Sequence, residues 1–255
     1  LGWFVGTLAT PAIPLWGLIS GGVASFVERY EFGVIDDNVL IIIASSIVIF
    51  MGLNLGPLIW FFDTRNFNAL GIGDTMSIEI SGKMPNFELN NANPSVGGDK
   101  VNFSDRLDTN GLIILFECNH CPYVIASIDR INDMSNFATS NQVGFIGINS
   151  NDASVYSSDS FENMQKRAVK GMPYPYLFDE TQIVAETFGA KRTPEFFLFD
   201  GDGRLVYKGR MDDSPRDPNQ VSTTELKDAV DSLIKGKNIE NNITESIGCS
   251  VKWKQ

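Results

Sequence analysis

Concentrated positive charge is absent from this sequence. Its 255 residues include 20 Lys and Arg against 31 Asp and Glu, which gives a formal net charge of −11, and the basic residues form no cluster. Proteins that bind nucleic acid neutralise its phosphates with concentrated cationic side chains. The sequence therefore argues against a nucleic-acid partner.

Cysteine and histidine are also scarce, with three Cys and one His in the whole chain. Three cysteines are too few to build a disulfide-stapled scaffold in a protein of this length. Two of them, Cys118 and Cys121, are separated by only two residues. Such a close pair favours redox or metal chemistry over structural disulfides.

Charge of either sign is nearly missing from residues 1–62, which contain five charged residues. Residues 39–62 are 24 consecutive uncharged positions, enough at about 1.5 Å per residue to cross a hydrocarbon core of about 30 Å. The aromatic residues at the end of this run suit the headgroup layer. We predict a membrane segment over 1–62 that contacts lipid through one or two transmembrane helices, a span at 39–62 and a second candidate at about 7–27, followed by a linker at 63–79.

Residues 21–28 and the acidic motif Asp36-Asp37-Asn38 resemble the C-terminal end of the CTP-dependent dolichol and phytol kinases, integral membrane enzymes that phosphorylate isoprenoid alcohols. If the acidic loop faces the cytosolic nucleotide pool, a single span places the rest of the chain on the extracytoplasmic side. The chain begins with Leu1 rather than Met, so we expect it to be a processed product or a fragment of a larger protein.

Residues 80–255 alternate between two hydrophobic periods, as in an α/β domain. Residues 111–116 form a continuous apolar run typical of a buried central strand, and residues 123–141 repeat apolar positions at three- and four-residue steps, as on a helix face. Ser222, with Glu225 three residues later, predicts the start of the last helix. The other predicted strands are 84–89, 101–105, 143–148, 176–178, 195–199 and 205–209, and the other predicted helices are 160–169 and 182–188.

The strongest chemical signal is Cys118-Asn119-His120-Cys121, which lies between the predicted central strand and the long helix. Unpaired N–H groups and the dipole at a helix N-terminus stabilise a thiolate, which would lower the pKa of Cys118 and make it a nucleophile. Cys121, one turn further on, could attack a mixed disulfide and release the product. A protonated His120 would stabilise the thiolate further.

Five stretches carry a family resemblance: 116–124, 149–152, 173–180, 193–200 and 247–254. Through them the domain resembles the thioredoxin superfamily, and more closely the peroxiredoxin-like proteins of the alkyl hydroperoxide reductase and thiol-specific antioxidant group. The resemblance implies a thioredoxin-like α/β fold, with a central mixed sheet flanked by helices, and Cys118 and Cys121 as the redox pair. It also implies a cis peptide bond between Thr193 and Pro194 that faces the pair and shapes a substrate groove.

Peroxide reduction is an alternative function. Proper peroxiredoxins place a Thr three residues before the reactive Cys, where this sequence has Leu115. Arg192, directly before Thr193, could partly supply the cation that such sites use. Cys249 in the tail could be a resolving or relay thiol, or simply a free cysteine.

Metal binding is a second alternative, because Cys118, His120, Cys121 and Cys249 together form an N/S ligand set suited to Cu(I) or Zn²⁺. The two-residue spacer between strand and helix favours redox chemistry instead, and the chain contains no second His. The sequence therefore predicts a membrane-tethered thiol–disulfide oxidoreductase without a cofactor. Its expected partners are protein thiols and disulfides or a small thiol reductant.

Overall fold

The computed structural model describes residues 77–254, which belong to a unit that spans Thr75–Gln255. Within this part of the chain, no helix combines the length and the apolar character needed to cross a membrane. The two predicted spans, the segment that resembles the dolichol and phytol kinases and most of the predicted linker lie outside the described residues.

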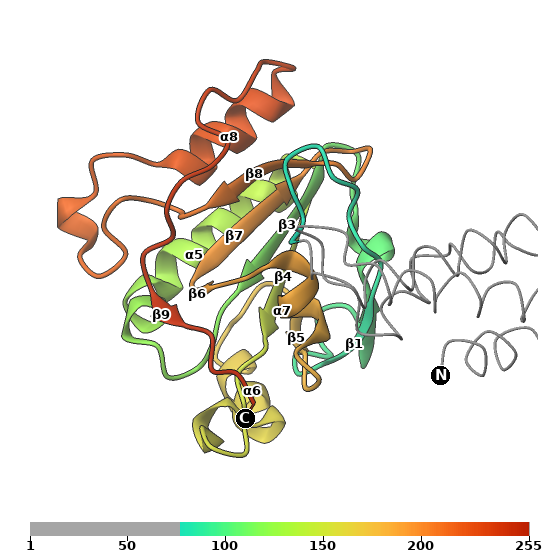
Figure 1. Ribbon diagram of the computed structural model, residues 1–255, viewed down its shortest axis with the longest axis vertical. Helices are drawn as coiled ribbons and strands as arrows, with labels where there is room; N and C mark the ends of the chain where they lie inside the picture. The colour runs from blue at the N-terminus through green and yellow to red at the C-terminus, as the bar shows by residue number, and fades with distance from the viewer. Residues whose placement is uncertain (1–76, 255) are drawn as a thin grey trace, which may run out of the picture. The chain divides into compact units, whose positions relative to one another are not determined.

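Seven strands form one mixed sheet (Figure 1). Their bounds are β1 Glu88–Asn91, β2 Lys100–Asn102, β3 Gly111–Phe116, β4 Val143–Asn149, β5 Tyr176–Phe178, β7 Glu195–Phe199 and β8 Leu205–Gly209. In the order β2-β1-β5-β4-β3-β7-β8, the pairs β3–β4 and β4–β5 are parallel and the other pairs are antiparallel. Two short strands, β6 (Arg192–Thr193) and β9 (Cys249–Ser250), pair with each other in a separate sheet. The predicted thioredoxin-like α/β fold with a mixed sheet is confirmed.

The helices cover both faces of the seven-stranded sheet. They are α5 Pro122–Ser140, α6 Phe161–Ala168, α7 Ile183–Phe188 and α8 Glu225–Ile234, with short 3₁₀ turns η2 Phe103–Arg106, η3 Ser157–Asp159 and η4 Pro218–Gln220. One hydrophobic cluster contains Met134 of α5, Met164 of α6 and Leu226 of α8. The other contains Val184 and Phe188 of α7. Figure 1 accordingly shows α5 and α7 on opposite faces of the sheet.

Strand β3 is buried on both faces, as its unbroken apolar run predicts. Ile113 and Leu115 pack in the cluster with α5, whereas Ile114 and Phe116 pack in the cluster with α7. The strand therefore lies in the middle of the domain, and the residues that follow Phe116 emerge at the edge where α5 begins.

The strand predicted at 84–89 lies further along the chain, as β1 at Glu88–Asn91. Two other predicted elements differ from the structure. Residues 101–105 were expected to form a strand, but β2 ends at Asn102, whose side chain accepts a hydrogen bond from the N–H of Ser104 and caps η2. The expected helix cap at Ser222 is also wrong. Its N–H and hydroxyl both bond to the Asp213 carboxylate, and α8 begins after Thr224. In both places a hydrogen bond from the backbone to a nearby side chain competes with the predicted element.

Candidate redox-active site

The cysteine pair lies in the turn between β3 and α5. Cys121 is the N-cap residue of α5 and Pro122 opens the helix, so Cys118 lies three residues before the cap. Both cysteines are in the reduced form, and both have 0% exposed surface. The predicted position between a buried strand and a helix N-terminus is confirmed, although the residue at the helix terminus is Cys121 and not Cys118.

Thr193 contacts both sulfur atoms. Its hydroxyl lies 3.6 Å from Cys118 Sγ, and its carbonyl oxygen accepts a hydrogen bond from Cys121 Sγ at 3.0 Å. The peptide bond between Thr193 and Pro194 is cis, as the family resemblance predicts. The segment 193–194 therefore faces the cysteine pair, 72 residues away from Cys121 in the sequence.

The two thiols are coupled. A hydrogen bond from Cys118 lowers the pKa of Cys121 to about 4, and the same hydrogen bond raises the pKa of Cys118. Burial and the Asp159 carboxylate raise the pKa of Cys118 further, whereas the Thr193 hydroxyl acts in the opposite direction. The pair therefore ionises as one unit, which carries a single negative charge at neutral pH and retains one proton.

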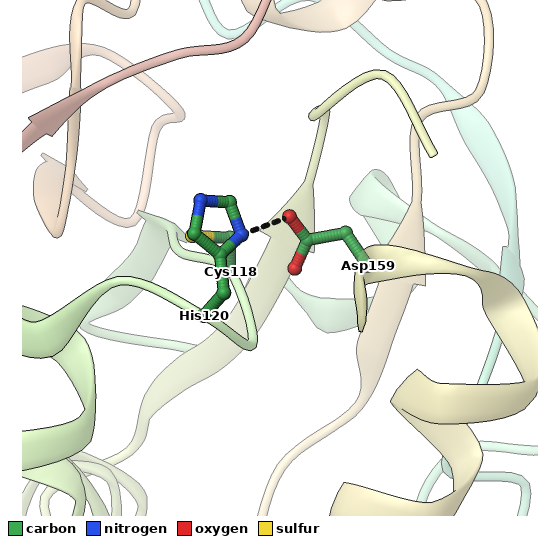
Figure 2. A group of neighbouring side chains, drawn as sticks. All are labelled: Cys118, His120 and Asp159. Carbon is green, nitrogen blue, oxygen red and sulfur yellow. Dashed lines mark hydrogen bonds and ion pairs between the residues drawn. The ribbon is translucent and has the colours of Figure 1, made fainter. Parts of the chain in front are cut away.

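His120 is held by a carboxylate that the sequence analysis missed. Its Nδ1 lies 2.6 Å from the carboxylate of Asp159, which is fully buried (Figure 2). The same carboxylate accepts hydrogen bonds from the N–H of Asn119 at 2.7 Å and from Asn151 Nδ2 at 2.9 Å. The His120 ring also stacks on Tyr156, with the two ring planes 6° apart. These contacts fix the orientation of the ring beside Cys118.

A second buried carboxylate, Glu117, lies directly before the cysteine pair. It forms an ion pair with Arg167 and accepts a hydrogen bond from the Tyr174 hydroxyl at 2.9 Å. Arg167 also donates from Nη1 to the backbone carbonyl of Cys118 at 3.2 Å. Burial and the Glu117 charge raise the pKa of Tyr174 well above its usual value, so its hydroxyl remains a donor. The network thus ties the turn to α6 and to the approach to β5.

Of the accessory residues predicted from the sequence, Arg192 is exposed, and it pairs with Ser250 across the β6–β9 sheet. The cation that contacts the cysteine turn is Arg167, not Arg192. Leu115 is buried in the core and brings no hydroxyl to the site. The hydroxyl next to Cys118 comes instead from Thr193.

The predicted metal ligands are grouped differently in space. Cys118 and His120 cluster with Asp159, with their potential ligand atoms all within 4.8 Å of one another. Cys121 and Cys249 do not belong to this group. The Asp159 oxygens already accept three hydrogen bonds, so the geometry fits a carboxylate that positions His120 better than one that binds a metal ion.

The mixed sheet, the buried Cys-x-x-Cys turn and the cis peptide bond opposite define a thioredoxin-like protein. More specifically, the chain belongs to the Redoxin family, whose sequence profile matches residues 80–226. Membership in this family indicates an oxidoreductase with a redox role. Cys249 lies beyond the matched residues.

Two solved structures are similar over most of the chain. A conserved protein from Geobacillus kaustophilus is 39% identical, with a TM-score of 0.64 over 70% of this chain and 94% of that chain. A hypothetical protein from Sinorhizobium meliloti 1021 is 33% identical, with the same TM-score over 70% of this chain and 96% of that chain. The search of curated proteins found no match.

Proposed function

We propose that the domain is a thiol–disulfide oxidoreductase that acts on protein disulfides and thiols or on a small thiol. The observation that carries this proposal is the shared contact of Cys118 and Cys121 with Thr193, beside a cis peptide bond and at the start of a helix. Two reduced sulfurs in one turn form a disulfide without a large rearrangement, which is the requirement for exchange.

We assign the attack on substrate to Cys118. The pKa values place the resting negative charge of the pair on Cys121, so the Cys118 thiolate forms when the remaining proton moves from Cys118 to Cys121. Cys121 Sγ lies 3.0 Å from the Thr193 carbonyl oxygen, which accepts a hydrogen bond from the S–H once Cys121 has taken the proton. Cys118 Sγ lies next to the Thr193 hydroxyl, which can donate to a thiolate. The S–H of Cys121 can rotate from the Thr193 carbonyl towards Cys118, so one proton serves both sulfurs.

The reaction with a disulfide substrate then has two steps. The Cys118 thiolate attacks one substrate sulfur, a mixed disulfide forms, and the other substrate sulfur leaves as a thiolate. Cys121 loses its proton and attacks Cys118 Sγ, which releases the second substrate sulfur and leaves a Cys118–Cys121 disulfide. Two electrons pass from the protein to the substrate. His120, held by Asp159, lies beside the attacking sulfur.

Single cysteine variants test these roles. Cys118→Ser should abolish reduction of a protein disulfide such as insulin, whereas Cys121→Ser should accumulate mixed disulfides visible by non-reducing electrophoresis and mass spectrometry. Serine keeps the size of each side chain, so loss of folding can be checked by comparing the thermal unfolding of both variants. Equal activity of the two variants would contradict the assignment.

Peroxide reduction is the second candidate, favoured by the Thr193 hydroxyl beside Cys118. The Cys118 thiolate would attack one peroxide oxygen and become a sulfenic acid, while the O–O bond breaks and the other oxygen leaves as water or an alcohol. Cys121 would then displace water from the sulfenic acid to form the disulfide. A stoichiometric burst of peroxide consumption by the reduced protein, lost in Cys118→Ser, would identify this activity. Turnover of disulfides without such a burst would exclude it.

We further propose that residues 1–62 tether the domain to a membrane and that the domain faces the extracytoplasmic side. The long uncharged run at 39–62 and the resemblance of the preceding loop to the dolichol and phytol kinases support this arrangement. In sealed right-side-out vesicles, a membrane-impermeant protease should then digest the domain. Protection of the domain in these vesicles, with digestion only after detergent is added, would place it on the other side.

A further inference from the structure

The buried position of the cysteine pair raises a problem of access. Cys118 and Cys121 have no exposed surface, yet a disulfide is reduced only when an attacking sulfur approaches one of its two sulfurs along the S–S axis. The chain contains one further cysteine, Cys249, which is partly exposed. A third thiol between solvent and the pair would give a reducing thiol a route to the oxidised pair.

Cys249 lies between solvent and the buried cysteine pair. It lies on β9, directly opposite Thr193 on β6, and Thr193 is the residue whose carbonyl contacts Cys121 Sγ. Cys249 packs against the hydrophobic cluster that contains Cys118 and Cys121. The Cys249 thiol and backbone N–H help to lower the pKa of Cys121. Cys249 therefore borders Cys121 on one side and solvent on the other.

The tail that carries Cys249 is anchored on the domain, although it lies near the C-terminus. The backbone N–H of Asp152 and the side chain of Gln182 both donate to the carbonyl of Lys252 at 2.8 Å. The N–H of Lys252 donates to the Asn151 side chain at 2.8 Å. These bonds hold the chain just after β9 and so keep the Cys249 thiol beside Cys121.

Gly248 allows the tail to approach the cis peptide bond closely. A Cβ atom at this position would lie 2.2 Å from the Thr193 carbonyl oxygen and 3.1 Å from the Pro194 nitrogen. Any other residue would therefore push the tail away from the segment that contacts both sulfurs. The close approach of Cys249 depends on the glycine that precedes it.

The charges around Cys249 make its reactivity depend on the state of the pair. Burial and the hydrogen bond with Cys121 raise the pKa of Cys249 to about 11, whereas Lys252 and Arg192 act in the opposite direction. When Cys121 is bound in a disulfide it carries no negative charge, and its effect on Cys249 is removed. The two cations remain, so Cys249 ionises more readily when the pair is oxidised.

We propose that Cys249 is a relay thiol that carries reducing equivalents from an external thiol to the buried pair. This inference rests on the proposed function. The Cys249 thiolate attacks Cys121 of the Cys118–Cys121 disulfide, so that a Cys121–Cys249 bond forms, the original bond breaks and Cys118 leaves as a thiolate. An external thiolate then attacks the sulfur of the partly exposed Cys249 and releases Cys121, and a second thiol resolves the resulting mixed disulfide. The external thiols supply the two electrons.

The test compares the full-length protein with Cys249→Ser, using Ser250→Ala on the same strand as the matched control. Each protein is oxidised, and its reduction by glutathione is followed in a stopped-flow instrument. Separately, Cys118→Ser is treated with diamide and its disulfides are mapped by mass spectrometry after non-reducing digestion. The equilibrium reduction potential of each protein is measured in dithiothreitol redox buffers.

We expect Cys249→Ser to be reduced at least tenfold more slowly than wild type and Ser250→Ala, with an unchanged equilibrium potential, and Cys118→Ser to form a Cys121–Cys249 disulfide. Equal rates in wild type and Cys249→Ser overturn the relay, and so does a slower rate without that disulfide. Failure of the wild-type protein to form a Cys118–Cys121 disulfide would instead overturn the proposed function.

Discussion

The two cysteines have surroundings of different kinds. On the Cys118 side, two fully buried carboxylates, Glu117 and Asp159, hold the turn through an ion pair and hydrogen bonds. On the Cys121 side, the sulfur donates to the backbone carbonyl of Thr193, and Cys249 pairs with Thr193 on the neighbouring strand. In the mechanism that we propose, the buried charge positions the attacking sulfur, and the partly exposed strand β9 gives external thiols access to the resolving sulfur.

The largest expected effect comes from breaking the buried charge network on the Cys118 side. Arg167→Met leaves Glu117 buried without its cation, which should lower the free energy of unfolding by about 3–5 kcal/mol. Urea denaturation measures this change. The matched control is the neighbouring Lys166→Met, which removes an exposed ion pair with Glu162 and should cause no measurable change. Similar midpoints for the two variants would contradict a structural role for the network.

On the Cys121 side, Gly248→Ala should displace the C-terminal tail while leaving all three cysteines in place in the sequence. The new Cβ would overlap the Thr193 carbonyl, so we expect Cys249 to move away from Cys121 and reduction by glutathione to slow about as much as in Cys249→Ser. Ser250→Ala is again the control. Wild-type rates in Gly248→Ala, together with an unchanged thermal unfolding curve, would show that close contact with the tail is unnecessary.

Asp159→Asn tests how charge acts on Cys118. The carboxylate raises the pKa of Cys118, so its neutral isostere should lower that pKa and speed alkylation of Cys118 by iodoacetamide at neutral pH. The rate is measured by mass spectrometry in the Cys249→Ser background, where fewer thiols compete. Slower alkylation would mean that the hydrogen bonds of Asp159 to the turn outweigh its charge.

The smallest expected effect is a change of stability at high pH. The pKa of Cys249 is raised from 9.0 to about 11 in the folded protein, so between these values the unfolded chain has lost a proton that the folded chain retains. Stability from this group is therefore present below pH 9 and is lost as the pH rises towards 11. Urea midpoints of wild type should fall more steeply over this window than those of Cys249→Ser. Parallel slopes would refute the shift.

Hydrophobic period and turn residues predicted the strands and helices whose formation depends on neighbouring residues in the sequence. The unbroken apolar run at 111–116 is a strand buried on both faces, and the helix predicted at 182–188 ends at Gly189, whose φ of 65° favours glycine. The predictions failed where a side chain accepted a hydrogen bond from the backbone, as Asp213 does from the N–H of Ser222 nine residues later. A single side-chain hydrogen bond of this kind leaves no periodic signal in the sequence.

In the candidate site, too, the sequence predicted the residues with a local motif and missed those brought in from elsewhere in the chain. The spacing of Cys118 and Cys121 and the family resemblance identified the pair and the cis peptide bond. Asp159 and Arg167 were missed, because they lie about 40 to 50 residues from the contacts they make and come from segments that look like ordinary polar surface.

By itself, the sequence determined the alternation of strands and helices, the Cys-x-x-Cys turn and the oxidoreductase class, since these follow from hydrophobic period and from residues close together in the chain. Only the tertiary structure decided which groups surround the two sulfurs. In the folded protein both thiols are buried, and the carboxylates of Glu117 and Asp159 lie on the Cys118 side. The C-terminal tail packs so that Cys249 lies on the Cys121 side. The physical reason is that burial and contact between distant residues arise when the sheet and its helices pack, and these determine the charge and the access of each thiol.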